Sequence, residues 1–352
     1  MKTKIFFLIF FSLFIALPPA QAKENTAVAA PPKRPKINLV WQIISPNVNT
    51  DFTKLPPVQG VNVVSPCWFD VVTAHGLLRN KMPHENAVTE LHAKGYKVWP
   101  LVTNSFDPQL THLLLENPEG QKNLQEYLLA LAEKYSFDGY NFDFENIADS
   151  DRHSFTALIR KITPGLRERG LTISLDVTTP SNTPYWSLCY DRGALAKEVD
   201  YLMIMAYDQH HPAMGKAGST AALNWVEEKL QATLKDVAKD KIILGLPLYT
   251  RIWKSAGNTS TTKGRTISMP ATEELISQEN IIPVWQKDLG QNYLSYTKEN
   301  KTYQIWQENA TSLKAKVNLV HKYQLAGIAS WRKGFETPDV WSALDEELQK
   351  KN

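Results

Sequence analysis

Eight short runs rich in β-branched and aromatic residues recur along the chain, and most are followed by a longer stretch with helical periodicity. The eight runs are residues 37–44, 61–65, 97–103, 139–145, 171–178, 201–207, 242–248 and 326–331. Strands that alternate with helices build a parallel sheet, and eight such units are typical of a closed (β/α)8 TIM barrel. A doubly wound open sheet is the rival α/β architecture, but eight strands suit closure better.

Amphipathic stretches between these runs predict helices. They are residues 85–94, 119–135, 151–169, 220–238 and 312–323. The second stretch places Leu124, Leu128 and Leu131 on one apolar stripe with a period of 3.6 residues. Asp151 precedes the third stretch, and we expect its side chain to cap that helix.

One interval, residues 254–310, breaks the alternation between the seventh and eighth runs. A connection of that length needs structure of its own, so we predict a small α+β insertion on the rim of the barrel that forms one wall of a cleft. We expect its aromatic residues to form a small core, with sugar-stacking platforms as the alternative. They are Trp285, Tyr293, Tyr296, Tyr303 and Trp306.

The first 22 residues have the order of a secretory signal peptide. Lys2 and Lys4 precede an apolar run over residues 5–17, and the triplet Ala20-Gln21-Ala22 predicts cleavage after Ala22. The apolar run is too short to span a bilayer, although an uncleaved anchor is the alternative. We therefore expect a protein that is secreted or held in the cell envelope, with no stable membrane insertion after cleavage.

Residues 23–36 are rich in proline and basic residues and predict a flexible linker, which leaves residues 37–352 for the catalytic barrel. The whole chain of 352 residues has a net charge of +3, and loss of Lys2 and Lys4 with the signal peptide lowers it to +1. Such a balance gives no basic field for nucleic acid or anionic lipid. We expect a monomer.

Two cysteines, Cys67 and Cys189, are too few for a disulfide scaffold, and the sequence leaves open whether they form one bridge or are separate buried residues. His210 and His211 are adjacent, which is a poor arrangement for chelation, and no His-Glu-x-x-His motif is present. The sequence therefore predicts neither a metal site nor a cofactor.

The fourth run carries the chemistry. Because side chains alternate across a strand, Asn141, Asp143 and Glu145 share one face, and aromatic residues occupy the other. In a barrel the aromatic face packs on helices, and the acidic face rises to the C-terminal mouth. Neighbouring carboxyl groups there can separate their pKa values, which provides a proton donor at neutral pH. An acidic loop that binds solvent or Ca²⁺ is the plainer alternative.

The segment DGYNFDFE, residues 138–145, resembles the D-G-x-D-x-D-x-E signature of glycoside hydrolase family 18, the chitinase-like barrels. Further segments agree in order, and together they span essentially the whole mature chain. They are SPCWF (65–69), MAYDQH (205–210), ILGLPLYTRIW (243–253) and GIASWRKG (327–334). The variants most resemble the branch of spore-cortex-lytic N-acetylglucosaminidases. Asn141 stands where chitinases carry the middle aspartate, which shortens the carboxylate relay by one member.

The resemblance implies a role for three residues. Glu145 is the general acid that protonates the leaving oxygen, and Asp143 orients the substrate's N-acetyl group. The hydroxyl of Tyr207 holds the oxygen of that group, which itself attacks the anomeric carbon. This substrate-assisted retention lies outside the usual scheme of two enzyme carboxylates. The 2-acetamido group is thereby a required part of the substrate.

The same resemblance implies substrate-binding residues around the acid. Asp208 binds substrate and Met205 packs under Asp143. The ring of Trp331 forms the floor of the subsite in which the sugar ring is distorted. Ordinary core packing is the alternative for Met205 and Trp331. Tyr249 and Arg251 alternate at the end of the seventh run and are candidates for contact with sugar or peptide, and Asn141 completes the predicted binding set.

The function implied is an exported glycoside hydrolase that cleaves β-1,4 N-acetylglucosaminyl bonds in peptidoglycan. Its partner is a polysaccharide that contains N-acetylglucosamine. Alternatives are the same chemistry on chitin or chitooligosaccharides, and an inactive barrel that acts as a carbohydrate-binding lectin. Retention of Glu145, Asp143 and Tyr207 argues against the lectin.

Overall fold

The computed structural model describes residues 35–43, 51–256 and 262–350. The chain divides into two compact units, Met1–Pro35 and Lys36–Asn352, and every described helix and strand belongs to the second. The predicted signal peptide and all but the last two residues of the predicted linker lie outside the described residues.

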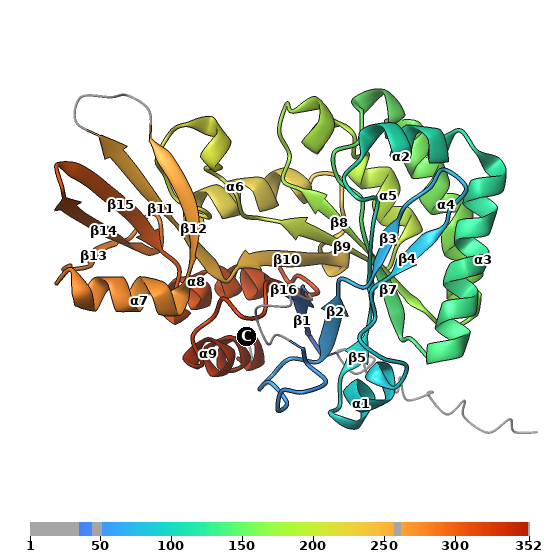
Figure 1. The fold of residues 1–352 in the computed structure, drawn as a ribbon, viewed down its shortest axis with the longest axis horizontal. Helices are drawn as coiled ribbons and strands as arrows, with labels where there is room; N and C mark the ends of the chain where they lie inside the picture. Colours follow the sequence, from blue (N-terminus) through green and yellow to red (C-terminus); the bar gives the residue numbers. More distant parts are fainter. Residues whose placement is uncertain (1–34, 44–50, 257–261, 351–352) are drawn as a thin grey trace, which may run out of the picture. The chain divides into compact units, whose positions relative to one another are not determined.

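An eleven-stranded sheet in the order β4-β3-β6-β7-β8-β9-β10-β16-β1-β2-β5 forms the body of this unit (Figure 1). Its main parallel strands are β1 Ile37–Gln42, β2 Val63–Pro66, β5 Lys97–Val98, β6 Leu101–Thr103, β7 Gly139–Asp143, β8 Thr172–Thr178, β9 Tyr201–Met205, β10 Ile242–Pro247 and β16 Gly327–Trp331. A short antiparallel hairpin, β3 Phe69–Val71 and β4 Leu78–Asn80, follows β2. The eight predicted runs are all strands of this sheet.

The third predicted strand is interrupted at Trp99 and Pro100, and its two halves close the barrel. β5 pairs with β2 and β6 pairs with β7. Hydrogen bonds continue across the interruption, because the Trp99 N–H donates to the Val64 carbonyl at 3.0 Å and the Pro100 carbonyl accepts from the Asn141 N–H at 3.1 Å. The (β/α)8 barrel is therefore confirmed.

Helices cover the outside of the sheet, with α3 and α4 over β7 (Figure 1). The helices of the barrel are α1 Ala87–Ala93, α2 Pro108–Leu115, α3 Pro118–Tyr135, α4 Arg152–Glu168, α5 Arg192–Glu198, α6 Leu223–Thr233, α8 Ala310–Lys322 and α9 Asp339–Gln349. Four short helical turns, η1 to η4, are Asp149–Asp151, Pro184–Leu188, Pro212–Met214 and Lys239–Lys241. Within the described ranges, none of the helices has the length and apolarity needed to span a membrane.

Asp151 occupies the N-cap position of α4, but the prediction that its side chain caps this helix is wrong. The carboxylate instead accepts a hydrogen bond from Nδ1 of His112, at 2.9 Å. The turn η1 runs directly into the helix, and the Arg152 N–H already bonds to the Asp149 carbonyl. The side chain of Asp151 is thus left to join α4 to α2.

The outward face of β7 builds the core between the barrel and its helices. Tyr140, Phe142 and Phe144 are fully buried there, and Phe144 stacks on Phe155 of α4 with ring centroids 5.9 Å apart. The Tyr140 hydroxyl donates to the Leu128 carbonyl of α3 at 2.7 Å. Burial of each such ring contributes about 1.5–3 kcal/mol. This aromatic face fixes which way the opposite, polar face of β7 points.

The barrel lumen is filled below its mouth by a separate apolar cluster. Its buried members are Leu39, Trp41, Val63, Trp99, Leu101, Met203, Ile243 and Ala329. Cys67 and Trp331 pack on this cluster. Cys67 and Cys189 are both free thiols, so the two cysteines form no bridge.

Between β10 and α8 the chain forms an antiparallel five-stranded sheet and one helix, at the left in Figure 1. The elements are β11 Tyr249–Ala256, β12 Lys263–Ser268, α7 Met269–Gln278, β13 Val284–Gln286, β14 Gln291–Lys298 and β15 Lys301–Gln307. We call this the rim sheet. It begins at Tyr249 instead of at residue 254, because β11 follows β10 almost without a break in the apolar run that joins them.

The core of the rim sheet is mainly aliphatic, so the predicted aromatic core is wrong in its main part. Its buried residues are Ile252, Ile267, Ile281, Leu294 and Ile305. Tyr296 and Tyr303 stack on each other at 4.6 Å and pack against this core. Tyr293 and Trp306 pair on the opposite face, and Trp285 is 44% exposed. Strand parity separates the Tyr296–Tyr303 pair from the Tyr293–Trp306 pair.

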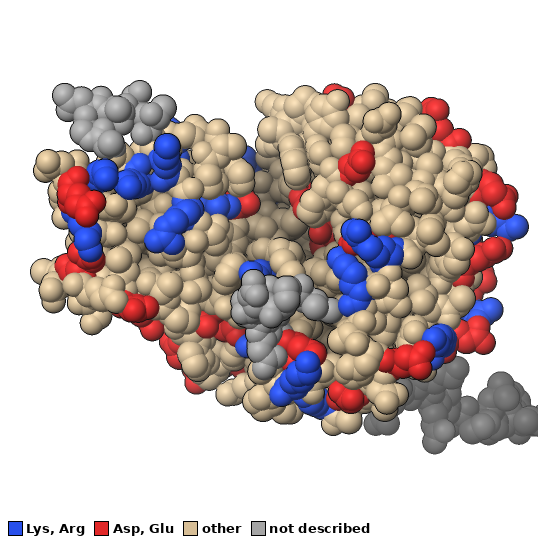
Figure 2. Space-filling view, viewed as in Figure 1, with Lys and Arg blue, Asp and Glu red and all other residues tan. Residues whose placement is uncertain are grey.

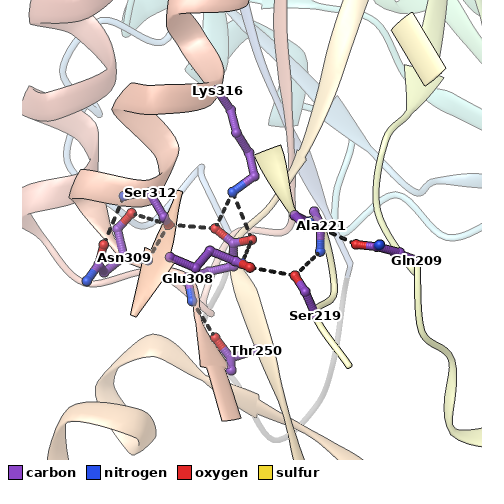
Figure 3. A network of polar contacts seen from close by, with 10 residues as sticks. Gln209, Ser219, Ala221, Thr250, Glu308, Asn309, Ser312 and Lys316 are labelled. Carbon is purple, nitrogen blue, oxygen red and sulfur yellow. Dashed lines mark hydrogen bonds and ion pairs between the residues drawn. The ribbon is translucent and has the colours of Figure 1, made fainter. Parts of the chain in front are cut away.

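A buried ion pair holds the rim sheet to the barrel (Figure 3). Glu308, which follows β15, accepts hydrogen bonds from Lys316 of α8 at 2.9 and 3.0 Å, and both side chains are completely buried. Ser312 and Gln291 each donate to the same carboxylate at 2.6 Å. The Glu308 N–H donates to the Thr250 hydroxyl at 2.9 Å. The Glu308 carboxylate thus joins β14 to α8, and its backbone N–H adds β11.

The same network continues to the segment that follows β9. Gln291 accepts from the Ser219 hydroxyl at 2.5 Å, and that hydroxyl accepts from the Ala221 N–H. The Gln209 side chain accepts from the Ala222 N–H at 2.9 Å (Figure 3). The network therefore reaches the residue next to Asp208.

Replacing Lys316 by Met should lower the free energy of unfolding by about 3–5 kcal/mol, because the Glu308 carboxylate is left buried without its cation. Urea denaturation measures this directly. The matched control is Lys314→Met on the same helix, whose pair with Glu346 is exposed and should cost less than about 1 kcal/mol. Equal losses in the two variants would contradict the role given to the buried pair.

Candidate active site

The polar face of β7 ends at the mouth of the barrel. Asn141 and Asp143 lie on the strand and are buried, with exposed fractions of 0% and 5%. Glu145 lies two residues beyond the strand end and is partly exposed, so the predicted strand extends too far. The structure brings these three predicted residues together at one place.

Asn141 is the centre of a buried hydrogen-bond network. Its side-chain oxygen accepts from Trp41 Nε1 at 2.7 Å and from the Ser65 hydroxyl at 3.1 Å. Its amide nitrogen donates to Asp176 Oδ1 at 2.8 Å, and the Met203 sulfur lies 3.8 Å from it. The predicted shortening of the relay at position 141 stays a prediction, and Asp176 of β8 adds a further buried carboxyl group that accepts from the Asn141 amide.

Asp176 was not identified from the sequence, although strand parity could have found it. In the fifth predicted strand, Ser174, Asp176 and Thr178 share one face, and β8 pairs directly with β7. An acidic residue that is 1% exposed on an inward position next to Asn141 is a strong signal of function.

The three carboxyl groups all have raised pKa values. Burial raises the pKa of Asp143 to about 7. Burial, and then the charge of Asp143, raise the pKa of Asp176 well above its ordinary value. The same two causes, followed by the charge of Asp208, raise the pKa of Glu145, although part of that residue is exposed. Like charges in a dry site cannot all ionise, so the group holds a proton at neutral pH.

The backbone of Glu145 is held on both sides while its carboxyl group stays available. Its N–H donates to Asn104 Oδ1 at 3.0 Å, and its carbonyl accepts from Asn104 Nδ2 at 2.7 Å. The Tyr190 hydroxyl donates to the Phe144 carbonyl at 2.8 Å. Asn104 and Tyr190 were also missed, because they follow other strands and only the fold brings them here. Both fix the position of Glu145.

A second cluster lies beside the carboxyl groups, at the end of β9 and the beginning of β11. Asp208 accepts from the Tyr249 hydroxyl and from Arg251 Nη2, and Arg251 is buried. The rings of Tyr207 and Tyr249 meet edge to face at 6.3 Å. The sequence predicts Tyr249 and Arg251 at the end of the seventh barrel strand. In the structure they belong to the rim sheet, because β10 ends at Pro247 and β11 begins at Tyr249.

Two predicted residues lie at the upper edge of the lumen core. Trp331 ends β16 and contacts Trp41 edge to face at 5.9 Å, on the cluster that closes the lumen. Met205 is the last residue of β9. The sulfur that contacts Asn141 belongs to Met203, which is the preceding inward-facing residue of the same strand. Trp331 is partly exposed, so one part of its ring is available at the mouth.

The surface is hollowed between the rim sheet and the barrel body, and acidic atoms are visible in the hollow (Figure 2). Among the described residues, no group of three or more His, Cys, Asp or Glu is placed to hold a metal ion. His210 bonds through Nδ1 to the Ser219 carbonyl at 3.0 Å, and His211 accepts from the Ala213 N–H. These two histidines hold their own loop.

The family model described as "Glycosyl hydrolases family 18" matches residues 64–335 of the chain. The chain is 28% identical over 268 residues to the uncharacterized glycosylase YvbX of Bacillus subtilis, which covers 73% of this chain and 76% of that protein. It is 25% identical over 252 residues to the cortical fragment-lytic enzyme of the same bacterium, covering 70% of this chain. The chain spans 58% of that enzyme's length.

The fold is similar to the crystal structure of a chitinase from Chromobacterium violaceum, with a TM-score of 0.79 and 25% sequence identity. The similarity covers 90% of this chain and 100% of that chain.

Replacing Asp143 by Asn should stabilise the protein at pH 8 and not at pH 4. A carboxyl group whose folded pKa is raised to about 7 binds more protons folded than unfolded, so stability falls as pH rises from about 4 to about 7. The neutral amide removes this loss of stability. The loss amounts to about 1.4 kcal/mol for each unit by which the folded pKa of Asp143 exceeds its unfolded pKa.

Thermal unfolding at the two pH values measures the difference in Tm. The exposed residue Asp149, changed to Asn, is the control and should leave Tm unchanged at both. A Tm that falls at pH 8 on replacement of Asp143 would show that the ionised carboxylate stabilises the fold, contrary to this account.

Proposed function

The chain belongs to glycosyl hydrolase family 18, and from that premise we propose that it cleaves β-1,4 N-acetylglucosaminyl bonds of peptidoglycan by substrate-assisted retaining catalysis. It is a family 18 glycosidase, related to cortex-lytic enzymes and chitinases. The observation that carries the proposed mechanism concerns one buried oxygen atom. Asp143 Oδ1 is buried and accepts no hydrogen bond from any residue in the described part of the chain.

A buried acceptor without a donor is costly unless a ligand provides one. The N–H of a 2-acetamido group is such a donor, and its hydrogen bond to Asp143 turns the acetamido carbonyl oxygen toward the anomeric carbon. Burial raises the pKa of the Tyr207 phenol well above its ordinary value, so the hydroxyl stays protonated and can donate to that same oxygen. The two side chains hold both ends of the amide.

Glu145 then works twice. Its raised pKa keeps the carboxyl group protonated, and it gives that proton to the leaving glycosidic oxygen as the carbonyl oxygen bonds to the anomeric carbon. The resulting carboxylate takes a proton from water, which attacks the same carbon and opens the oxazolinium ring. Two displacements at one carbon return the original configuration.

Peptidoglycan is favoured as the polymer by the relative named for lysis of cortical fragments, since bacterial cortex and wall glycans alternate N-acetylglucosamine with N-acetylmuramic acid. Export belongs to the same proposal, because Lys2, Lys4 and the apolar run that ends before Ala20 form a secretory signal. The exported protein should begin at Lys23 by intact-mass measurement. An extracellular chain that still begins at Met1 would contradict cleavage.

Chitin is the second candidate, favoured by the similarity to the Chromobacterium chitinase. Mass spectrometry of products from purified peptidoglycan and from chitin, digested side by side, separates the two. We expect new reducing-end N-acetylglucosamine from peptidoglycan. The same ends from chitin alone would replace the first proposal by the second, and no products from either polymer would favour a carbohydrate-binding lectin.

Replacing Glu145 by Gln should lower kcat by at least about 100-fold while glycan binding is kept and Tm does not fall, because the proton transfer is removed and no stabilising charge is lost. A thiazoline analogue of N-acetylglucosamine should inhibit the wild-type enzyme, since it mimics the cyclic intermediate. Glu168→Gln, at an exposed position at the end of α4, is the control. Activity above a few per cent in the Glu145 variant would refute the assignment of the acid, and indifference to the thiazoline would refute the substrate-assisted step.

A further inference from the structure

Arg332 follows Trp331 directly, at the mouth end of β16. The next residue, Lys333, donates its N–H to the Trp41 carbonyl at 3.0 Å, which holds the segment against the end of β1. The Arg332 guanidinium lies over the ring of Phe335, 4.0 Å from its centroid. That ring in turn packs on Tyr249 at 6.1 Å. Arg332 is therefore part of the wall of the site.

The other cations of this region are already paired with carboxylates. Asp70 pairs with both Arg79 and Lys81, each at 2.7 Å. Arg251 pairs with Asp208, and Lys333 pairs with Glu336. Each of these cations thus has a carboxylate partner, although Arg79 and Lys81 share one and keep a net charge of +1 between them.

Arg332 differs from these cations. Across the described ranges no carboxylate lies within ion-pair distance of it, and Glu336, which pairs with Lys333, acts on it only from farther away. The one hydrogen bond of its guanidinium runs from Nη1 to the Lys333 carbonyl at 3.4 Å. The residue is only partly exposed, and burial lowers the pKa of its guanidinium. Stacking on an aromatic ring compensates part of the lost hydration of a guanidinium. The stacked face leaves the N–H groups on the edge of the guanidinium plane available, which suits bidentate binding of a carboxylate.

Arg332 also lies near the reacting groups. The Cys67 N–H donates to the Gln42 carbonyl at 2.9 Å, beside the Trp41 carbonyl that holds Lys333, and Cys67 packs on the lumen core. Trp41 Nε1 in turn donates to Asn141, one inward position below Asp143 on β7. Lys and Arg side chains are visible on both flanks of the hollow in Figure 2. An anionic group on a glycan bound at Asp143 would therefore come within reach of an unneutralised guanidinium.

We propose that Arg332 binds a carboxylate carried by the glycan and thereby selects an acid-bearing glycan over chitin. This inference rests on the proposed function and deepens it. The carboxylate is either the lactyl group of N-acetylmuramic acid or a carboxylate of the peptide attached to it. Chitin carries neither group.

The test compares Arg332→Gln and Arg332→Lys with wild type on three substrates. They are a peptide-free glycan with free lactyl carboxylates, the same glycan with peptides attached through lactyl amides, and chitohexaose. For Arg332→Gln, kcat/KM on the preferred acidic glycan relative to chitohexaose should fall about 10- to 100-fold, mainly through KM. Arg332→Lys keeps the positive charge but loses the two parallel N–H donors of the guanidinium. The same ratio of kcat/KM should therefore fall less in this variant.

The two sources of carboxylate give different results. A selective loss on the peptide-free glycan assigns the lactyl group, and a selective loss on the peptide-bearing glycan assigns the peptide. In wild type the preference should weaken as NaCl is raised, whereas Arg332→Gln should show little salt dependence. Arg160→Gln, at an exposed cation of α4 that has its own carboxylate partner in Glu198, is the control and should not change the preference.

Two results would overturn the inference: an unchanged preference in Arg332→Gln, or the same loss on chitohexaose as on both acidic glycans. The latter would assign Arg332 to packing alone. These results differ from a failure of the proposed function, in which the wild-type enzyme itself leaves both acidic glycans intact.

Discussion

The site depends on burying acidic groups where water solvates them poorly. Strand β7 does this through its alternation, because three aromatic side chains on its outward face lock it against α3 and α4. The opposite face must then carry Asn141 and Asp143 into the lumen. Desolvation there keeps a proton on the carboxyl groups at neutral pH, which is what a general acid requires. The arrangement costs stability, as active sites commonly do.

The rim sheet completes a site that the barrel alone leaves open. Tyr249 and Arg251 reach Asp208 from β11, so the barrel loop after β9 and the rim sheet share one cluster. Behind that cluster, the buried Glu308–Lys316 pair connects the sheet to α8 and, through Ser219, to the same loop. The loop and the rim sheet are therefore held by contacts on two sides. Conformational freedom there would misplace groups that must orient an amide.

Much of the fold could be predicted from the alternation of strand-like runs with helical stretches. The predictions that failed did so for physical reasons. Runs rich in β-branched and aromatic residues located all eight barrel strands, and two-residue alternation along the fourth run identified the outward aromatics of β7. These patterns missed the start of the rim sheet at Tyr249, because an apolar run continues through a change of sheet. Asp176 was readable from parity, whereas Asn104 and Tyr190 act on Glu145 only through tertiary contact. Local sequence does not encode such neighbours.

The central claim is that the carboxyl groups at the barrel mouth hold a proton at neutral pH. Carbon-13 NMR of enzyme labelled at its Asp and Glu carboxyl carbons tests it most directly, by following each resonance against pH. The account predicts at least one carboxyl that titrates near pH 7 or above, with a curve that changes on replacement of Asp143. If every carboxyl resonance titrated below about pH 5, as unperturbed groups do, the account would be contradicted.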